Sequence, residues 1–560
     1  MNFMRYGLIA AIAVVSILLI NQWTQFQDQK AATVAVDRSS QAIIDTPAYN
    51  ATPTVAVSND EIPAVVDNSE PQSVAVSTPA IDPQRYTRIH TDVFNVVIDN
   101  LGGDIIFVAL INHKETQDAN GKPFVLLERT AQRTYVAQSG LIGKNGTDSN
   151  EGRPLFTTAQ ADYALDGSDK LTVDLKYNQQ GVDITKRYTF TQGSYTVGVD
   201  YLIDNKTDHS WNATLYAQLK RDNSEDPGAS TSGMGMQPFL GFATRTNDDK
   251  YVKFSFDEIN EEKFNENVTH GWIATVQHYF ISAWVPPATG EFKYQALTTA
   301  NQQNIIRLTG ENTTVAAGQQ GKITSSFYAG PKDQQTLGEL APGLDLTVDY
   351  GWLWMVAQPL YKVLDFIHSI VGNWGFAIIL LTVLIKAIFF KLSAASYKSM
   401  ARMRKFAPKM AQIKEQYGDD RQKQSQAMME LYKKEKINPL GGCLPILVQM
   451  PVFISLYWVL MESVELRHAP WMFWIHDLSA MDPYYILPIL MVATMWFQQT
   501  LNPPPPDPMQ AKIMKMMPFI FGVFFLWFPS GLVLYWVVNN TLSIAQQWYI
   551  TRKIESGELT

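Results

Sequence analysis

A lysine inside an apolar segment is the side chain of this sequence that bears most directly on chemistry. Lys386 lies 12 residues into the apolar run 374–392, where Thr382 is the other notable polar residue. An ionisable group at the centre of a membrane span costs about 2.5–3.5 kcal/mol on insertion scales, so such groups usually face a bundle interior or a wet cavity. Two interpretations stay open. Lys386 charges a functional cavity, or it snorkels so that its ammonium reaches the cytoplasmic headgroups.

Polar residues on the same and later apolar runs are candidates for lining such a cavity. Thr382 lies one helical turn before Lys386 and therefore on the same face. Each polar residue by itself more often makes a helix–helix hydrogen bond, whereas together they indicate a polar interior toward the cytoplasmic half. The later apolar runs, 443–461, 484–501, 516–528 and 532–550, contain no acidic residue, which favours a water-filled setting over a proton relay. The candidates are Thr382, Gln449, Ser455, Asn540 and Ser543.

The sequence offers no constellation for covalent catalysis. It lacks H-E-x-x-H, G-x-x-x-x-G-K-[ST] and G-x-S-x-G, and its eight histidines are scattered. Cys443, the single cysteine, excludes an internal disulfide framework and a cysteine-based zinc cluster. We therefore expect no catalytic residue, no metal site and no cofactor.

The apolar runs predict six membrane spans. Only 12 of the 124 residues in 437–560 are charged, which is too few for a water-facing surface. Residues 1–26 predict an uncleaved signal anchor; a cleaved signal peptide is the alternative, although residues 21–26 offer no small-x-small site. Span 514–529 is short for a hydrocarbon core of about 30 Å and suggests local thinning. The later spans are 373–392, 438–462, 484–501, 514–529 and 531–550.

Basic residues in the loops predict the topology. The loop 397–436 has eleven Lys or Arg against five acids, whereas the loop 462–483 has one Arg and four acids. Positive-inside counting places 397–436 and the tail 551–560 in the cytoplasm. Both termini are then cytoplasmic, and residues 85–345 lie outside.

The segments before 373 predict a tether, a β domain and a surface helix. Residues 27–84 are rich in Pro, Ser and Asp and predict a disordered linker. Residues 85–345 show period-two runs, such as Tyr195 to Ile203 and Phe254 with Phe256, which predict a large antiparallel sandwich. A helical patch is expected near 332–345. Residues 346–372 predict an amphipathic interfacial helix, with an ordinary domain helix as the alternative.

Residues 393–437 predict a cytoplasmic hairpin of two helices. The stripe from Met400 to Tyr417 predicts the first helix, and Asn438-Pro439 ends the second. Its methionines make an adaptable face, and its basic face suits anionic lipid or the ribosome. A solvated hairpin that serves only topology is the alternative. The candidate contact residues are Arg402, Arg404, Lys405, Lys409, Tyr417, Met428 and Met429.

Several motifs in order resemble the YidC/Oxa/Alb family of membrane insertases, in its Gram-negative bacterial form. The first motif, NPLGGCLPILVQMP, is the longest. The five motifs occupy 438–451, 474–478, 482–485, 507–510 and 528–535. The resemblance implies a six-helix membrane bundle, five helices of which form the core of the family, plus a periplasmic all-β supersandwich.

The family resemblance also implies a function and a site. The family inserts and folds inner-membrane proteins, alone or with the Sec translocon, through a hydrophilic groove open to cytoplasm and lipid. Lys386 stands where the family usually has Arg, and so keeps the charge without the planar fork. Thr382 and Gln449 match groove positions, and Trp536 matches an aromatic that faces the substrate. The implied partners are nascent membrane proteins, the Sec translocon, the ribosome and anionic phospholipid, with no nucleic acid as a specific ligand.

Two other classes of function stay open from the residues. One is a small-solute transporter or channel with an exported binding domain. The other is a membrane-tethered periplasmic sugar-binding protein, in which 346–560 serves only as an anchor. A substrate-dependent flux would favour the first class, and loss of all activity on deletion of the β domain would favour the second.

Overall fold

The structure is a computed structural model that describes most of the chain after residue 84. The described ranges are 62–63, 85–117, 121–149, 152–226, 238–261, 263–418, 420–435, 444–502 and 508–556. These ranges all belong to one compact unit. The expected anchor 1–26 and nearly all of the linker 27–84 lie outside the described residues. So do residues 436–443, which include the whole NPLGGC stretch with Cys443, and residues 557–560.

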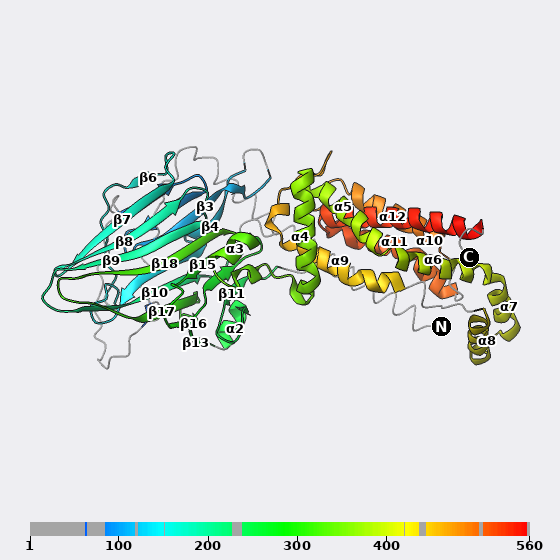
Figure 1. Ribbon diagram of the computed structural model, residues 1–560, viewed down its shortest axis with the longest axis horizontal. Coiled ribbons are helices and arrows are strands. Elements are labelled where there is room, and N and C mark those ends of the chain that lie inside the picture. Colours follow the sequence, from blue (N-terminus) through cyan, green and yellow to red (C-terminus); the bar gives the residue numbers. More distant parts are fainter. Residues whose placement is uncertain are drawn as a thin grey trace. The chain divides into compact units, whose positions relative to one another are not determined.

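The described residues of the β domain form two sheets (Figure 1). One sheet has the order β13 (Phe264–Val268), β16 (Phe292–Thr298), β17 (Asn304–Val315), β10 (Trp211–Arg221), β5 (Thr134–Ile142), β4 (Pro123–Arg129), β3 (Asp104–Lys114), β2 (Phe94–Asp99), β1 (Tyr86–His90) and β6 (Asp162–Ala164). The other has the order β12 (Val252–Phe254), β11 (Gly241–Thr244), β14 (Ile273–Val276), β15 (Phe280–Val285), β18 (Gln320–Pro331), β9 (Thr196–Asn205), β8 (Val182–Thr191) and β7 (Lys170–Gln179). The expected all-β sandwich is confirmed. Its pairing is antiparallel except where β6 joins β1 in parallel.

Period-two alternation produces the core of the sandwich. Along β8 and β9 every second side chain is buried, as expected when one face of each strand packs on the opposite sheet. Lys186 takes one of these inward positions and is fully buried. Its ammonium donates to the carbonyls of Gly102 (3.1 Å), Gly103 (2.8 Å) and Ser139 (3.0 Å). Three acceptors match the three protons of the charged form, but burial lowers the pKa of Lys186 to about 7, so this form prevails only below that pH.

One strand prediction was wrong. Phe254 ends β12, but Phe256 opens the short helix α2 (Phe256–Glu261). The Glu258 side chain accepts from the Ser255 N–H, and the Ser255 hydroxyl accepts from the Glu258 N–H. This reciprocal pair is a capping box, a local signal that starts a helix and overrides the two alternating phenylalanines. The expected helical patch is α3 (Gln334–Leu340), capped by Asp333.

The C-terminal part is helical. Its long helices are α4 (Trp354–Val371), α5 (Trp374–Ile388), α6 (Phe390–Lys405), α7 (Ala407–Tyr417), α8 (Arg421–Lys434), α9 (Leu444–Glu462), α10 (Ile486–Thr500), α11 (Pro508–Phe524) and α12 (Ser530–Glu555). Short 3₁₀ turns lie at Leu344–Thr347, Gly351–Leu353, Val464–Leu466 and Phe525–Trp527. A core of buried apolar residues joins α4, α5, α9, α10 and α12.

No described helix is by itself both long and apolar enough to cross a membrane. The pair Trp374–Ile388 and Phe390–Ala401 meets that requirement together, with a bend of 65° at Phe389. The expected continuous run 373–392 is therefore divided between two helices.

The predicted two-helix hairpin is also divided. The stripe from Met400 to Tyr417 breaks at Phe406, so that α6, α7 and α8 follow one another. Pro408 explains the break, because proline has no N–H to donate to the carbonyl four residues back and its ring clashes with that carbonyl. The second helix of the prediction corresponds to α8, which Asp420 caps through its side chain.

Candidate functional site

Lys386 and two polar residues from distant parts of the sequence come together in the helical core. Lys386 on α5 is 5% exposed. Its ammonium donates to Ser543 Oγ on α12 at 2.7 Å and to Gln449 Oε1 on α9 at 3.5 Å. Three helices therefore meet at one charged group. This inward arrangement differs from snorkelling, in which the ammonium would reach out to lipid headgroups.

Local capping fixes the helices that carry these residues. Asn373 precedes α5, and its side chain accepts from the Phe376 N–H, which satisfies one of the free donors at the helix start. The Asn373 amide also donates to the carbonyls of Pro470 and Trp471. On α12, the Ser530 hydroxyl donates to the Asp477 carbonyl at 2.7 Å. The N-terminal ends of α5 and α12 are thus tied to the same connection, 463–485.

The electrostatics of Lys386 are those of a positive charge among neutral dipoles. The Ser543 hydroxyl accepts from Lys386 while donating to the Asn539 carbonyl, so its dipole is oriented toward the ammonium. A hydroxyl and an amide oxygen offset only part of the cost of removing an ammonium from water. A buried cation in this setting attracts an anionic or strongly polar group that enters beside it.

Two other predicted groove residues make hydrogen bonds away from the Lys386 ammonium. Thr382 is buried one turn before Lys386, but its hydroxyl donates to the Ile378 carbonyl of its own helix at 2.7 Å. Asn540 donates to Thr494 Oγ1 on α10 at 3.4 Å, which is a helix–helix contact. These two side chains shape the interior without contacting the ammonium.

Two groups in the same region have unused hydrogen-bonding capacity within the described residues. Trp536 Nε1 is buried without an acceptor, and its ring packs edge-on against Phe453 at 4.5 Å. Ser455 Oγ on α9 is likewise buried without a partner. Unsatisfied buried polar atoms are uncommon in native proteins. Both atoms therefore remain available to a further hydrogen-bond partner.

Sequence reasoning missed the contribution of α6. Ser393, Ser396 and Tyr397 lie within the segment expected to be hairpin, yet all three are buried. The Tyr397 hydroxyl donates to the Ser543 carbonyl at 3.4 Å, so α6 packs on α12 beside the Lys386 contact. Small residues three apart on one face permit close helix approach, and that spacing was the available signal.

The hairpin residues are partly described. Arg402, Arg404 and Lys405 lie on α6, and the structure does not describe their side chains. Lys409 is exposed and pairs with Glu435 at 3.2 Å, linking α7 to the end of α8. Tyr417 and Met428 are half-buried, whereas Met429 is 60% exposed. The Met429 side chain is thus available to an apolar partner.

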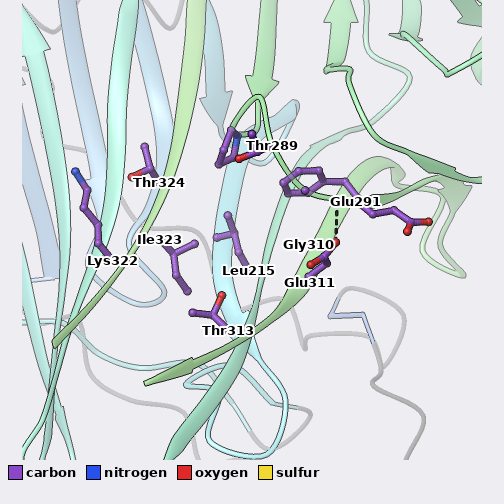
Figure 2. A pocket seen from close by; sticks show the side chains of 12 residues that line it. Leu215, Thr289, Glu291, Gly310, Glu311, Thr313, Lys322, Ile323 and Thr324 are labelled. Carbon is purple, nitrogen blue, oxygen red and sulfur yellow. Dashed lines mark hydrogen bonds between the residues drawn. The ribbon is translucent and has the colours of Figure 1, made fainter. Parts of the chain in front are cut away.

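A pocket of about 240 Å³ lies in the sandwich, away from this site (Figure 2). It is lined by residues of β10, β17 and β18 and of the loop that leads into β16, among them Leu215, Glu311 and Lys322. Two of its three charged side chains, those of Glu311 and Lys322, have partners. Glu311 accepts from the Glu291 N–H at 2.9 Å, and Lys322 pairs with Asp200 at 3.0 Å. This arrangement leaves little unmatched polarity with which to select a ligand.

The fold and the site together define a class: a β-sandwich joined to an apolar helical core that contains a buried cation. Two family models cover that architecture. The model of the YidC periplasmic domain matches residues 86–363, and the model of the 60Kd inner membrane protein matches residues 366–557. The chain therefore belongs to the YidC family, a family of inner-membrane proteins with a periplasmic domain.

Curated relatives match the whole chain. Proteins named membrane protein insertase YidC are 52% identical in Ectopseudomonas mendocina, 54% in Pseudomonas fluorescens and 52% in Pseudomonas aeruginosa. Each alignment covers 100% of this chain and 99–100% of the relative. A solved structure of an active YidC insertase is 18% identical, with a TM-score of 0.38 over 84% of this chain and 93% of that one. A TM-score at that level adds no argument of its own.

Proposed function

We propose that this chain is a membrane protein insertase and folding chaperone of a Gram-negative inner membrane. The buried Lys386, held by Ser543 and Gln449 at the meeting point of three helices, is the observation that carries the proposal. Full-length relatives named as insertases support it. The proposed groove residues are Lys386, Thr382, Gln449, Trp536, Asn540 and Ser543.

The proposed mechanism lowers the cost of bringing a polar segment into lipid. Every unsatisfied backbone or charged group in the hydrocarbon core is expensive. A groove with a positive charge and oriented hydroxyl and amide dipoles replaces part of the lost hydration, and it attracts acidic flanks of the substrate. The apolar helix of the substrate then moves sideways into lipid, and burial of its apolar surface drives the step.

The groove is proposed to be closed on the outer side. The first turns of α12 are apolar: Leu532, Val533, Leu534 and Tyr535 are all buried. They pack in one cluster with Leu381 and Leu456, among others. An apolar layer of this kind opposes a continuous aqueous path. It therefore favours the insertase over the transporter or channel.

The proposed arrangement in the membrane has six spans with both termini in the cytoplasm and the sandwich in the periplasm. The eleven basic residues of loop 397–436 support this orientation. The cytoplasmic segment from the end of α6 through α7 and α8 is proposed to meet anionic phospholipid, the ribosome or the nascent chain. The proposed contact residues are Arg402, Arg404, Lys405, Lys409, Tyr417, Met428 and Met429. The Sec translocon is a proposed partner for larger substrates. The proposed mechanism needs no cofactor or metal.

Site-specific photocrosslinking tests the proposal. A photoreactive residue replaces Thr382 or Trp536, and ribosome-stalled nascent chains of a single-span protein serve as the probe. We expect crosslinks that appear when the substrate helix leaves the ribosome and disappear when it is released into lipid. A photoreactive residue at the lipid-exposed position Ile520 on α11 serves as the control. An inserting chain that crosslinks to neither groove position would contradict the proposed path.

A further inference from the structure

A buried ion pair joins the last strand of the sandwich to the outer end of α9. Lys332 follows directly after β18, and Glu462 is the last residue of α9. The Lys332 ammonium donates to Glu462 Oε2 at 2.7 Å and to the Thr347 carbonyl at 3.4 Å. The two side chains are only 2% and 6% exposed. This is an ion pair between residues 130 positions apart, held away from water.

Further contacts at the same place tie the outer end of α9 to the sandwich. A ring nitrogen of His278 hydrogen-bonds to the Met461 carbonyl at 2.7 Å. Burial lowers the pKa of His278 to about 3, so its ring is neutral and donates that hydrogen bond. Val464 belongs to the core of the sandwich. The Arg467 guanidinium donates to the Lys114 carbonyl at 2.7 Å. The pair thus lies inside a packed junction.

The helix that this junction holds also carries a groove residue. Gln449, which accepts from Lys386, lies 13 residues before Glu462 on α9, which is about 20 Å along a helix. Pro451 lies between them. A proline inside a helix removes a backbone hydrogen bond and permits a kink. Gln449 therefore depends on restraints at the outer end of α9 for its position relative to Lys386.

We propose that Lys332 and Glu462 are positioning residues that fix α9, and with it Gln449, against the groove. The inference rests on the proposed insertase function and assigns part of that function to the end of the β domain. The ion pair acts through α9 and does not contact the substrate. Loss of the pair lets α9 shift at Pro451, which separates Gln449 from the Lys386 ammonium.

The chain supplies a matched control pair. Lys253 on β12 pairs with Asp349 at 2.6 Å, and this pair likewise joins the sandwich to the segment that follows it. Its side chains are 46% and 27% exposed. An exposed pair of this kind contributes little to stability. It tests whether any ion pair between these segments affects insertion, or only the buried one.

The experiment compares four variants of the full-length protein in cells depleted of the native insertase. Lys332→Met leaves Glu462 buried without its partner, and Lys332→Arg keeps the charge. The double variant Lys332→Met with Glu462→Gln removes both charges, and Lys253→Met is the control. Insertion of a single-span substrate, protein level and thermal unfolding in detergent are measured for each.

We expect Lys332→Met to lower insertion about fivefold or more, while Lys332→Arg and Lys253→Met stay within about twofold of the wild type. The double variant separates a positioning role from a merely structural one. Without unpaired buried charge it should regain its protein level and thermal unfolding temperature, yet insertion should stay low because α9 is no longer fixed. Wild-type-like insertion by either Lys332→Met or the double variant would overturn the proposal. A wild-type chain that inserts nothing would instead contradict the proposed function.

Discussion

The Lys386 ammonium and the Ser543 hydroxyl, 157 residues apart in sequence, form a 2.7 Å hydrogen bond in the interior of the helical core. The bond joins α5 to α12. It holds the positive charge of Lys386 inside the helical core. The sequence alone had left two interpretations open, a charged cavity and a side chain that snorkels to the headgroups.

Removing the charge should impair insertion. Lys386→Ala deletes the cation that is expected to attract polar flanks of the substrate. We expect insertion of single- and double-span substrates to fall about tenfold, which corresponds to about 1.4 kcal/mol. Lys386→Arg should retain most activity because the charge stays. Lys391→Ala, on the exposed face of α6, is the control. Full activity of Lys386→Ala on all such substrates would exclude a role for the groove charge.

Removing the acceptor should cost stability more than activity. Ser543→Ala takes the nearest oxygen from the buried ammonium, and an unsatisfied buried donor costs about 1–3 kcal/mol. We expect a lower thermal unfolding temperature in detergent and a smaller loss of insertion than in Lys386→Ala. Thr541→Ala is the matched control, because the exposed Thr541 hydroxyl bonds only within its own helix, to the Val537 carbonyl. Equal unfolding temperatures for the two variants would argue against the Lys386–Ser543 bond.

Ser455→Ala should be tolerated and should stabilise the protein slightly. Among the described residues, the buried Ser455 hydroxyl has no hydrogen-bond partner. Its removal therefore relieves a desolvation cost, and we expect a gain of about 0.5–1 kcal/mol. The control is Ser463→Ala, which removes a 2.6 Å hydrogen bond from a buried hydroxyl to the Val459 carbonyl. That change should destabilise. The measurement is the thermal unfolding temperature of both variants. A lower unfolding temperature for Ser455→Ala than for the wild type would mean that this hydroxyl has a hydrogen-bond partner.

The stability of the sandwich should depend on pH through Lys186. Burial lowers the pKa of Lys186 from 10.5 to about 7. Between these values the unfolded chain holds a proton that the folded chain lacks, so stability falls as pH decreases from 10.5 to 7, by up to about 1.4 kcal/mol per pH unit. Lys186→Met should lack this component. Chemical unfolding of both proteins is followed by tryptophan fluorescence at pH 7.5 and 9.5. The change in unfolding free energy per pH unit is then compared between the two proteins. Identical slopes would contradict a neutral buried Lys186.

Glu465→Gln should stabilise the junction at neutral pH. Burial raises the pKa of Glu465 from 4.5 to about 6, and its carboxylate accepts from the Tyr361 hydroxyl at 2.9 Å. Because the folded protein holds the Glu465 proton more tightly than the unfolded chain, this group stabilises the fold below pH 4.5 relative to higher pH. That contribution is lost as the pH rises through about 6. We expect the variant to gain about 2 kcal/mol at pH 7.5 and nothing at pH 4. The control Glu266→Gln, at an exposed position on β13, should leave the free energy of unfolding unchanged at both pH 7.5 and pH 4.

Much of the architecture was readable from local patterns. Period-two runs predicted the sandwich, and the apolar run around Lys386 singled out this residue while leaving a cavity and snorkelling both open. Where one local signal competed with another, the prediction failed. The capping box at Ser255 ended a supposed strand, and Pro408 broke the supposed first hairpin helix. Both signals were present in the sequence, but alternating or striped apolar residues nearby masked them.

The sequence by itself determined most strands and helices and the inward faces of the strands, because periodicity is a property of neighbours along the chain. Only the tertiary structure decided which buried groups meet. Lys386 donates hydrogen bonds to Ser543 and Gln449, whereas Asn540 donates one to Thr494. Lys332 and Glu462 are unremarkable charges in the sequence and become a buried pair only when β18 and α9 pack together. Partner choice depends on how whole elements pack, and no local pattern encodes it.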